Sequence, residues 1–183
     1  MSKIAILNGA PRKNGNTAAL VRAFMEGAQA AGSEVREVYL QGLDLHGCLG
    51  CNACRRGVAN GGPCAQHDGM DEVYDAFMWA DTIAFASPVY FCGVTGTLKT
   101  ACDRLYALWS TVGQPGIRRR AVMLSTGNMM IFDQVLAWYA QFMRYSGWTD
   151  LGTVLRPGSA YGMGRLDDPQ GEALARELGR SIG

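Results

Sequence analysis

The sequence has almost no net charge. Lys and Arg together number 17, Asp and Glu number 16, and the formal net charge is +1 over 183 residues. No run of like charge is longer than Arg118, Arg119 and Arg120. Because proteins that bind nucleic acids usually carry a broad basic face, this balance argues against a nucleic-acid partner.

Long hydrophobic runs are missing as well. The first apolar run, Ile4–Leu7, follows a single Lys and is four residues long, which is too short for the core of a signal peptide. No later segment is long enough to span a membrane. We therefore expect a cytoplasmic protein without a membrane partner, in a compartment where thiols stay reduced. There, six cysteines favour metal binding, catalysis or burial over disulfide bonds.

No internal repeat, low-complexity tract or linker divides the chain, so we expect one domain over residues 1–183. Short apolar runs alternate with segments that have apolar residues at helical spacing, which is typical of strands and helices in turn. The predicted strands are Lys3–Leu7, Val35–Leu40, Thr82–Ser87, Arg120–Thr126 and Leu151–Leu155. The predicted helices are Thr17–Ala31, Asp71–Ala80, Gly96–Trp109, Phe132–Tyr145 and Pro169–Ser181.

This alternation predicts an α/β fold, a doubly wound parallel sheet of five strands with helices on both faces, because parallel neighbours need crossover helices. Such sheets bind ligands at the carboxyl ends of their strands. The loops that follow the first, third and fourth predicted strands are therefore where we look for a site.

The first of these loops, "NGAPRKNGNTAAL", places glycines, amides and a hydroxyl between a strand and a helix N-terminus. Free N–H groups at that terminus and the charge of Arg12 would suit a phosphate monoester. The loop contains neither GxGxxG nor GxxxxGK[ST], which weakens dinucleotide and P-loop interpretations. A plain capped loop, with Asn16 or Thr17 as the N-cap, is the alternative.

The other two loops could complete such a site. In "SPVYFCGVTGTLKTACDR", Tyr90 and Phe91 offer flat apolar faces just past a strand end, although an aromatic pair can equally pack against the next helix. The loop "STGNMM" again places hydroxyls and a glycine after a strand. Three donor-rich loops at one edge of the sheet favour a phosphorylated aromatic cofactor.

These motifs, in this order, resemble the NAD(P)H-dependent FMN reductases of the flavodoxin-like superfamily. "NGAPRKNGNT" is similar to the phosphate loop of that family, and "SPVYFCGVTGTLKTACDR" to its isoalloxazine loop and the helix that follows. The resemblance implies strand order 2-1-3-4-5, bound FMN, NAD(P)H as a co-substrate, and a homodimer or homotetramer.

The resemblance also implies which residues bind the flavin. The phosphate would be held by Ala10, Pro11, Arg12, Asn14, Asn16 and Thr17. The ring would be bordered by Pro88, Val89, Tyr90, Phe91 and Gly93, with Ser125, Thr126 and Gly127 on its other side. Ala10 departs from the family, in which Ser is frequent here, so backbone donors would have to replace one hydroxyl.

A cysteine-rich loop, residues 46–70, follows the second predicted strand. It contains Cys48, Cys51, Cys54 and Cys64 in the spacing C-x2-C-x2-C-x9-C. Short CxxC steps turn successive thiolates toward one point, as iron-sulfur clusters require, whereas zinc sites more often have two separate CxxC pairs.

The loop resembles that of the iron-sulfur flavoproteins, a branch of the same family in which a compact cysteine motif binds a 4Fe-4S cluster near FMN. "HDGM" stands where that branch has an Asp-rich segment. The spacing of nine residues is longer than in the family, so a loop of free or redox-active thiols is the alternative. We expect the other two cysteines, Cys92 and Cys102, to be small buried residues.

We therefore predict an FMN-dependent oxidoreductase that passes electrons from NAD(P)H to a small-molecule acceptor such as a quinone or a flavin. With a cluster, the protein would instead exchange single electrons with a ferredoxin. A different class is a non-catalytic electron carrier or a thiol or metal redox sensor. The nearly neutral charge argues against a carrier of the flavodoxin type, which docks through acidic surfaces.

Overall fold

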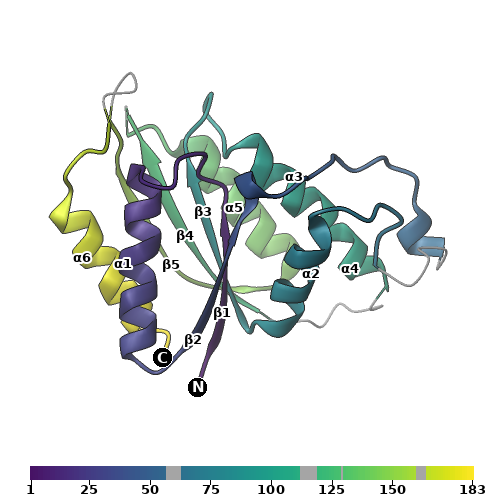
Figure 1. The fold of residues 1–183 in the computed structure, drawn as a ribbon, viewed down its shortest axis with the longest axis horizontal. Helices are drawn as coiled ribbons and strands as arrows, with labels where there is room; N and C mark the ends of the chain where they lie inside the picture. Colours follow the sequence, from purple (N-terminus) through teal and green to yellow (C-terminus); the bar gives the residue numbers. More distant parts are fainter. Residues whose placement is uncertain (57–62, 112–118, 129, 160–163) are drawn as a thin grey trace.

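The computed structural model describes residues 1–56, 63–111, 119–128, 130–159 and 164–183. Its centre is a parallel five-stranded sheet in the order β2-β1-β3-β4-β5 (Figure 1). The strands are β1 Lys3–Asn8, β2 Glu34–Tyr39, β3 Thr82–Pro88, β4 Arg120–Gly127 and β5 Thr149–Pro157. The predicted sheet and its strand order are confirmed.

Helices cover both faces of this sheet (Figure 1). They are α1 Asn16–Ala30, α2 Met70–Trp79, α3 Gly96–Arg104, α4 Tyr106–Thr111, α5 Asp133–Ser146 and α6 Pro169–Arg180. Helices α1 and α6 pack side by side on one face, and α2 to α5 lie on the other. Two 3-10 turns, η1 Leu40–Gly42 and η2 Ala53–Arg56, lie between β2 and α2. No helix in the described ranges is long and apolar enough to cross a membrane.

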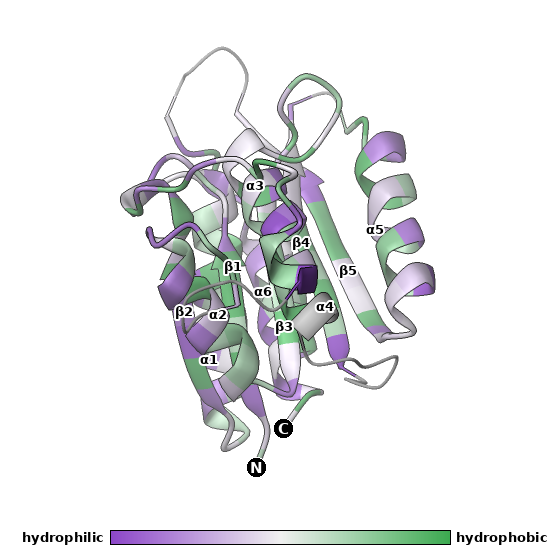
Figure 2. Ribbon diagram, turned by 90° about the vertical axis from the view of Figure 1, so that its right-hand side faces the viewer, coloured by the Kyte–Doolittle hydropathy of each residue, from purple (hydrophilic) through white to green (hydrophobic). Residues whose placement is uncertain are grey.

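The central strands form the core because their side chains alternate between two helical layers. In β1, Ile4 and Ile6 pack toward α1 and α6, while Ala5 and Leu7 pack toward α2 and α5. Figure 2 shows hydrophobic residues along these strands, with hydrophobic and hydrophilic bands alternating along α5. The edge strand β2 (EVREVY) has three exposed residues and only one buried side chain, that of Val38.

The prediction of one helix over residues 96–109 is wrong, because the helix breaks at Leu105. In a continuous helix the Leu108 N–H would donate to the Arg104 carbonyl. Instead it donates to the Leu105 carbonyl at 3.0 Å, and the Arg104 carbonyl accepts from the Tyr74 hydroxyl at 3.1 Å. A tertiary hydrogen bond from α2 therefore replaces one bond of the helix and separates α3 from α4.

Every strand also differs from its predicted bounds by one or two residues, and β5 differs most. Strand β2 ends at Tyr39, because Leu40 already belongs to the turn η1. Strand β5 is longer at both ends than predicted and reaches Pro157. It pairs with β4 up to Gly127, across a register shift between Ala121 and Met123. The extra length brings the end of β5 to the same edge as the ends of β1, β3 and β4.

Candidate functional site

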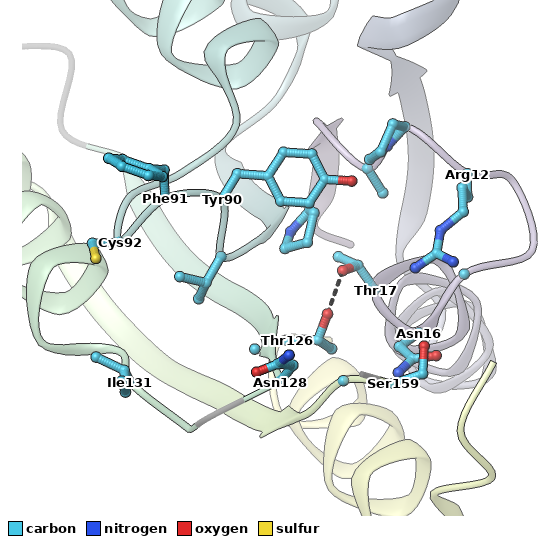
Figure 3. Close-up of a pocket in the computed structure, with 17 residues that line it drawn as sticks. Arg12, Asn16, Thr17, Tyr90, Phe91, Cys92, Thr126, Asn128, Ile131 and Ser159 are labelled. Carbon is cyan, nitrogen blue, oxygen red and sulfur yellow. Dashed lines mark hydrogen bonds between the residues drawn. The ribbon is translucent and has the colours of Figure 1, made fainter. Parts of the chain in front are cut away.

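A cavity of about 580 Å³ opens at the carboxyl ends of β1, β3 and β4 (Figure 3). Strand order reverses between β1 and β3, so this is the place where doubly wound sheets bind ligands. Its lining comes from the predicted loops and from the end of β5: Ala10, Pro11, Arg12, Gly15, Asn16, Thr17, Pro88, Val89, Tyr90, Phe91, Cys92, Thr126, Gly127, Asn128, Ile131, Gly158 and Ser159.

Three of the residues predicted for the flavin site do not line this cavity. Asn14 is exposed on the loop after β1. Ser125 is fully buried beneath the cavity and donates to the Ser87 carbonyl at 2.8 Å. Gly93 closes a turn with Tyr90, through backbone bonds of 2.9 and 3.1 Å. Ser125 and Gly93 thus shape the loops that carry other lining residues.

Sequence reasoning missed the contribution of the loop after β5. Gly158 and Ser159 line the cavity, and the Gly158 N–H donates to the Gly127 carbonyl at 3.1 Å. Both residues directly follow a strand, which is the signal that identified the other loops. The prediction confined the site to the loops after the first, third and fourth strands and therefore left out the loop after β5. Gly15, Cys92 and Asn128, which also line the cavity, adjoin predicted residues, and Ile131 directly follows the loop "STGNMM".

The prediction that Cys92 is buried is wrong, whereas Cys102 is buried as predicted. Cys92 and Phe91 lie at the tip of the Tyr90–Gly93 turn with φ of 71° and 47°. Left-handed backbone is unfavourable for residues with a side chain and is concentrated at functional sites. The turn leaves Phe91 fully exposed at the cavity mouth, and Figure 3 shows it pointing away from Thr17.

Buried hydroxyls connect the three predicted loops. Thr17 and Thr126 share a hydrogen bond of 2.7 Å between their Oγ1 atoms, which joins the loop after β1 to the loop after β4 (Figure 3). The Thr95 N–H donates to Ser87 Oγ at 2.9 Å. The Thr95 hydroxyl donates to the Gly9 carbonyl, also at 2.9 Å. These bonds fix the floor of the cavity before any ligand binds.

Side chains from β1 and β2 set the shape of the loop after β1. Asn8 accepts from the Ala10 N–H at 2.9 Å and donates to Glu37 at 2.7 Å. The Tyr39 hydroxyl donates to the Pro11 carbonyl at 2.9 Å. Since the Ala10 N–H already has an intramolecular acceptor, it is not a free donor at the position where the family often has a serine hydroxyl.

The remaining groups at this end of the cavity fit a phosphate monoester. The N-cap of α1 is Gly15, which has no side chain to cap the first N–H groups of the helix. Asn16 Nδ2 is buried without a hydrogen-bond partner among the described residues, and Arg12 lies exposed beside it. Helix N–H groups, an amide and a guanidinium are the donors that phosphates prefer. The opposite end, with Pro88, Val89 and Tyr90, is apolar enough for a planar ring.

The structure does not bring the four motif cysteines together. Cys48 and Cys51 are exposed, Cys54 and Cys64 are half-buried, and all four are free thiols. Among the described residues, no three His, Cys, Asp or Glu side chains form a group that could hold a metal ion. The predicted 4Fe-4S site is therefore not preformed in this part of the chain, and the structure gives no basis for chemistry at a cluster.

Cys64 nevertheless differs from the other cysteines in its surroundings. Burial opposes its ionisation, yet hydrogen bonds from the Gln66 backbone and from Arg104 hold the pKa of its thiol below the ordinary value. Burial strongly raises the pKa of Cys102, which is enclosed in the core.

Comparisons with known proteins agree with this geometry. A model of the NADPH-dependent FMN reductase family matches residues 2–152. An iron-sulfur flavoprotein of Archaeoglobus fulgidus is 36% identical over 105 residues, which are 57% of this chain and 46% of that protein. An iron-sulfur flavoprotein of Methanocaldococcus jannaschii is 37% identical over 102 residues, 56% of this chain and 51% of that protein. The chain thus spans about half the length of these curated relatives.

Solved structures share the fold. The NAD(P)H:quinone oxidoreductase of Methanothermobacter marburgensis superposes with a TM-score of 0.67 at 18% identity, over 98% of this chain and 93% of that one. An NADH:FMN oxidoreductase superposes with a TM-score of 0.63 at 22% identity, over 100% and 91% of the two chains. This likeness confirms the predicted doubly wound architecture.

Proposed function

Because the chain belongs to the NADPH-dependent FMN reductase family, we propose that it binds FMN in the cavity described above and oxidises NAD(P)H. Membership confirms the predicted family and supports the predicted class of flavin-dependent oxidoreductase. The observation that carries the proposal is the division of the cavity into a donor-rich end at α1 and an apolar end at the Tyr90 turn. FMN has the same division, with a phosphate at one end and a ring at the other.

In this proposal Arg12, Asn16 and Thr17 hold the phosphate together with the N-terminus of α1. Val89, Tyr90 and Gly127 border the ring. FMN, when bound, supplies the hydride chemistry and the exchange between two-electron and one-electron steps. The protein orients the ring, excludes water from one of its faces and leaves the other open.

We propose that the acceptor is a small molecule such as a quinone or a free flavin. Tyr90 is half exposed and Phe91 fully exposed at the cavity mouth. Flat aromatic faces at an opening can stack against a nicotinamide or a planar acceptor. Both substrates would then use the same open face in turn.

The test is reduction of the bound flavin. Purified protein loaded with FMN should lose its visible flavin absorbance when NADH or NADPH is added without oxygen, and regain it when a quinone or free flavin follows. Multiple turnovers under steady-state conditions should accompany this cycle. If the flavin binds but neither nucleotide reduces it, the proposal is contradicted, and a non-catalytic electron carrier or a redox sensor becomes the better interpretation.

A second candidate is an iron-sulfur flavoprotein that exchanges single electrons with a ferredoxin. The C-x2-C-x2-C-x9-C spacing favours it, as do the names of the relatives in Archaeoglobus and Methanocaldococcus. Protein purified without oxygen should then contain about four iron and four sulfide atoms per chain. It should also show broad absorbance beneath the flavin bands, which Cys51→Ala removes. A clean flavin spectrum without iron would rule this candidate out.

A further inference from the structure

A buried charge lies beneath the cysteine loop and does not line the flavin cavity. Arg104 is the last residue of α3, and its side chain is 1% exposed. Its ion-pair partner, Asp68, has a side chain that is 6% exposed. Charges are removed from water only where several partners compensate the cost, so the contacts of this guanidinium are informative.

The Arg104 guanidinium contacts both ends of the cysteine loop. Nη1 donates to the His46 carbonyl at 3.1 Å and to the Asp68 carboxylate. Nη2 donates to the Gln66 carbonyl at 3.1 Å and to Cys64 Sγ at 3.6 Å. His46 precedes the first cysteine of the motif, and the other three partners are the last cysteine and the residues that follow it. One side chain thus holds the beginning and the end of the loop together.

Further bonds join the same two ends directly. Asp68 accepts from the His46 N–H at 3.1 Å, and the Gly69 N–H donates to the Asp44 carbonyl at 2.9 Å. The Gln66 amide donates to the Gly47 carbonyl at 3.2 Å. These bonds hold residues 44–47 against residues 66–69, so the loop leaves the protein and returns to it at one place.

Arginine suits this position better than lysine would. Its planar fork can donate to several acceptors in fixed directions at once, whereas an ammonium is a single point charge. Here the acceptors are two backbone carbonyls, a carboxylate and a sulfur. None of these contacts requires a metal ion.

We propose that Arg104 is a positioning residue for the cysteine motif, which holds Cys64 and the chain just before Cys48 at one place on the protein. The position of Cys64 is then set by its contact with Arg104 and not by the long spacing of nine residues between Cys54 and Cys64. Cys64 is the member of the motif that Arg104 contacts. Cys54, on η2, packs separately against the same core, and Cys48 and Cys51 are exposed. This inference goes beyond the proposed flavin chemistry and does not depend on it.

Amide hydrogen exchange on the full-length, iron-free protein tests the proposal. In Arg104→Met, exchange in residues 44–50 and 64–70 should become roughly tenfold faster or more, because charge-assisted bonds that protect both ends are lost. Arg104→Lys keeps the charge without the fork and should restore part of this protection. Arg176→Lys is the matched control, since Arg176 pairs with Glu26 across α6 and α1 on the other face of the sheet.

Two results would overturn the proposal. One is unchanged exchange at both ends of the loop in Arg104→Met. The other is acceleration that is equally large in β1 and β4, which would make Arg104 a residue of general core stability. If Arg104→Met does not fold, Asp68→Asn tests the same anchor from the loop side, and the same pattern is expected. The iron content of the wild-type protein affects none of these readouts, so failure of the cluster candidate and failure of this proposal are distinguishable.

Discussion

Asn16 lies in the wall of the cavity with one polar atom bonded and the other without a partner. Its Oδ1 accepts from the Leu166 N–H at 3.0 Å, while its Nδ2 is buried without a partner among the described residues. Buried amide donors are rarely left unsatisfied, because such a group loses its bonds to water and gains nothing in return. An acceptor supplied by a ligand is the simplest way to satisfy it.

We predict that Asn16→Asp weakens FMN binding by roughly 10- to 100-fold, since it removes a donor and places a negative charge beside the phosphate. Stability without FMN should change little, because a carboxylate in the first turn of α1 interacts favourably with the helix dipole. Titration of flavin fluorescence would measure the affinity. Gln29→Glu, the same chemical change at the exposed far end of α1, serves as the control. Equal affinities in both variants would mean that the phosphate binds elsewhere.

For single residues, the sequence predicts which positions lie near the site, but it does not predict which way each side chain points. Asn16 and Thr17 could be assigned to the site because they follow a strand and begin a helix. Ser125 lies near the carboxyl end of β4 and was assigned to the site for that reason, yet its hydroxyl points into the protein and donates to the Ser87 carbonyl. Which way a side chain faces depends on the register between β3 and β4, and a single strand's sequence does not contain that register.

Among the elements, α6 depends on one carboxylate for its attachment. Asp168 caps the helix by accepting from the Gly171 N–H at 3.1 Å. The same carboxylate accepts two bonds from Arg156 of β5, at 2.8 and 2.7 Å. The hydrogen bonds from Arg156 are the main reason why the pKa of Asp168 lies below its usual range. One side chain therefore both begins α6 and ties it to the sheet.

We predict that Asp168→Ala lowers the free energy of unfolding by about 1–3 kcal/mol at pH 7, through loss of the cap and of the ion pair. Asp168→Asn should lose less, because Asn is also a good N-cap. A carboxylate whose folded pKa is lowered contributes stability that is fully present above its unfolded pKa of about 3.9 and is lost as the pH falls through the folded value. Urea unfolding at pH 7 and below pH 4 should therefore show the gap between wild type and Asp168→Asn closing in acid. A gap that stays constant with pH would mean that the ion pair contributes nothing.

The break between α3 and α4 could not be predicted from the local sequence. Apolar spacing continues through Leu105 without a glycine or proline, so the pattern predicts one helix. The helix is interrupted because the Tyr74 hydroxyl donates a hydrogen bond to the Arg104 carbonyl, which therefore does not accept the next bond of the helix. Tyr74 is thirty positions away along the chain, and no local pattern encodes that contact. The anchor of the cysteine loop was missed for the same reason, because Arg104 was visible in the sequence only as the end of a helical motif.

For the whole molecule, the parallel sheet made most of the site predictable. Parallel strands all end at the same edge, so loops far apart in the sequence meet there once the strand order is known. The phosphate loop, the Tyr90 turn and the loop after β4 come together in this way. The cysteine loop also begins at this edge, after β2, but the chain then runs to one side, and none of its described residues lines the cavity (Figure 1). Its conformation therefore depends on particular contacts, which the topology does not determine.

Since the cavity joins the ends of β1, β3, β4 and β5, a ligand that spans it should stabilise the fold as a unit. We predict that FMN at a hundredfold excess over its Kd stabilises the flavin-free protein by about 2.7 kcal/mol. For a chain of this size this corresponds to a rise in Tm of roughly 5–10 °C. Riboflavin at the same concentration should give a much smaller rise, because it has the ring but lacks the phosphate that Arg12, Asn16 and the N-terminus of α1 are placed to bind. Thermal unfolding followed by circular dichroism measures both shifts. Equal shifts with FMN and riboflavin would show that the ring alone accounts for binding, and that the donor-rich end of the cavity serves another ligand.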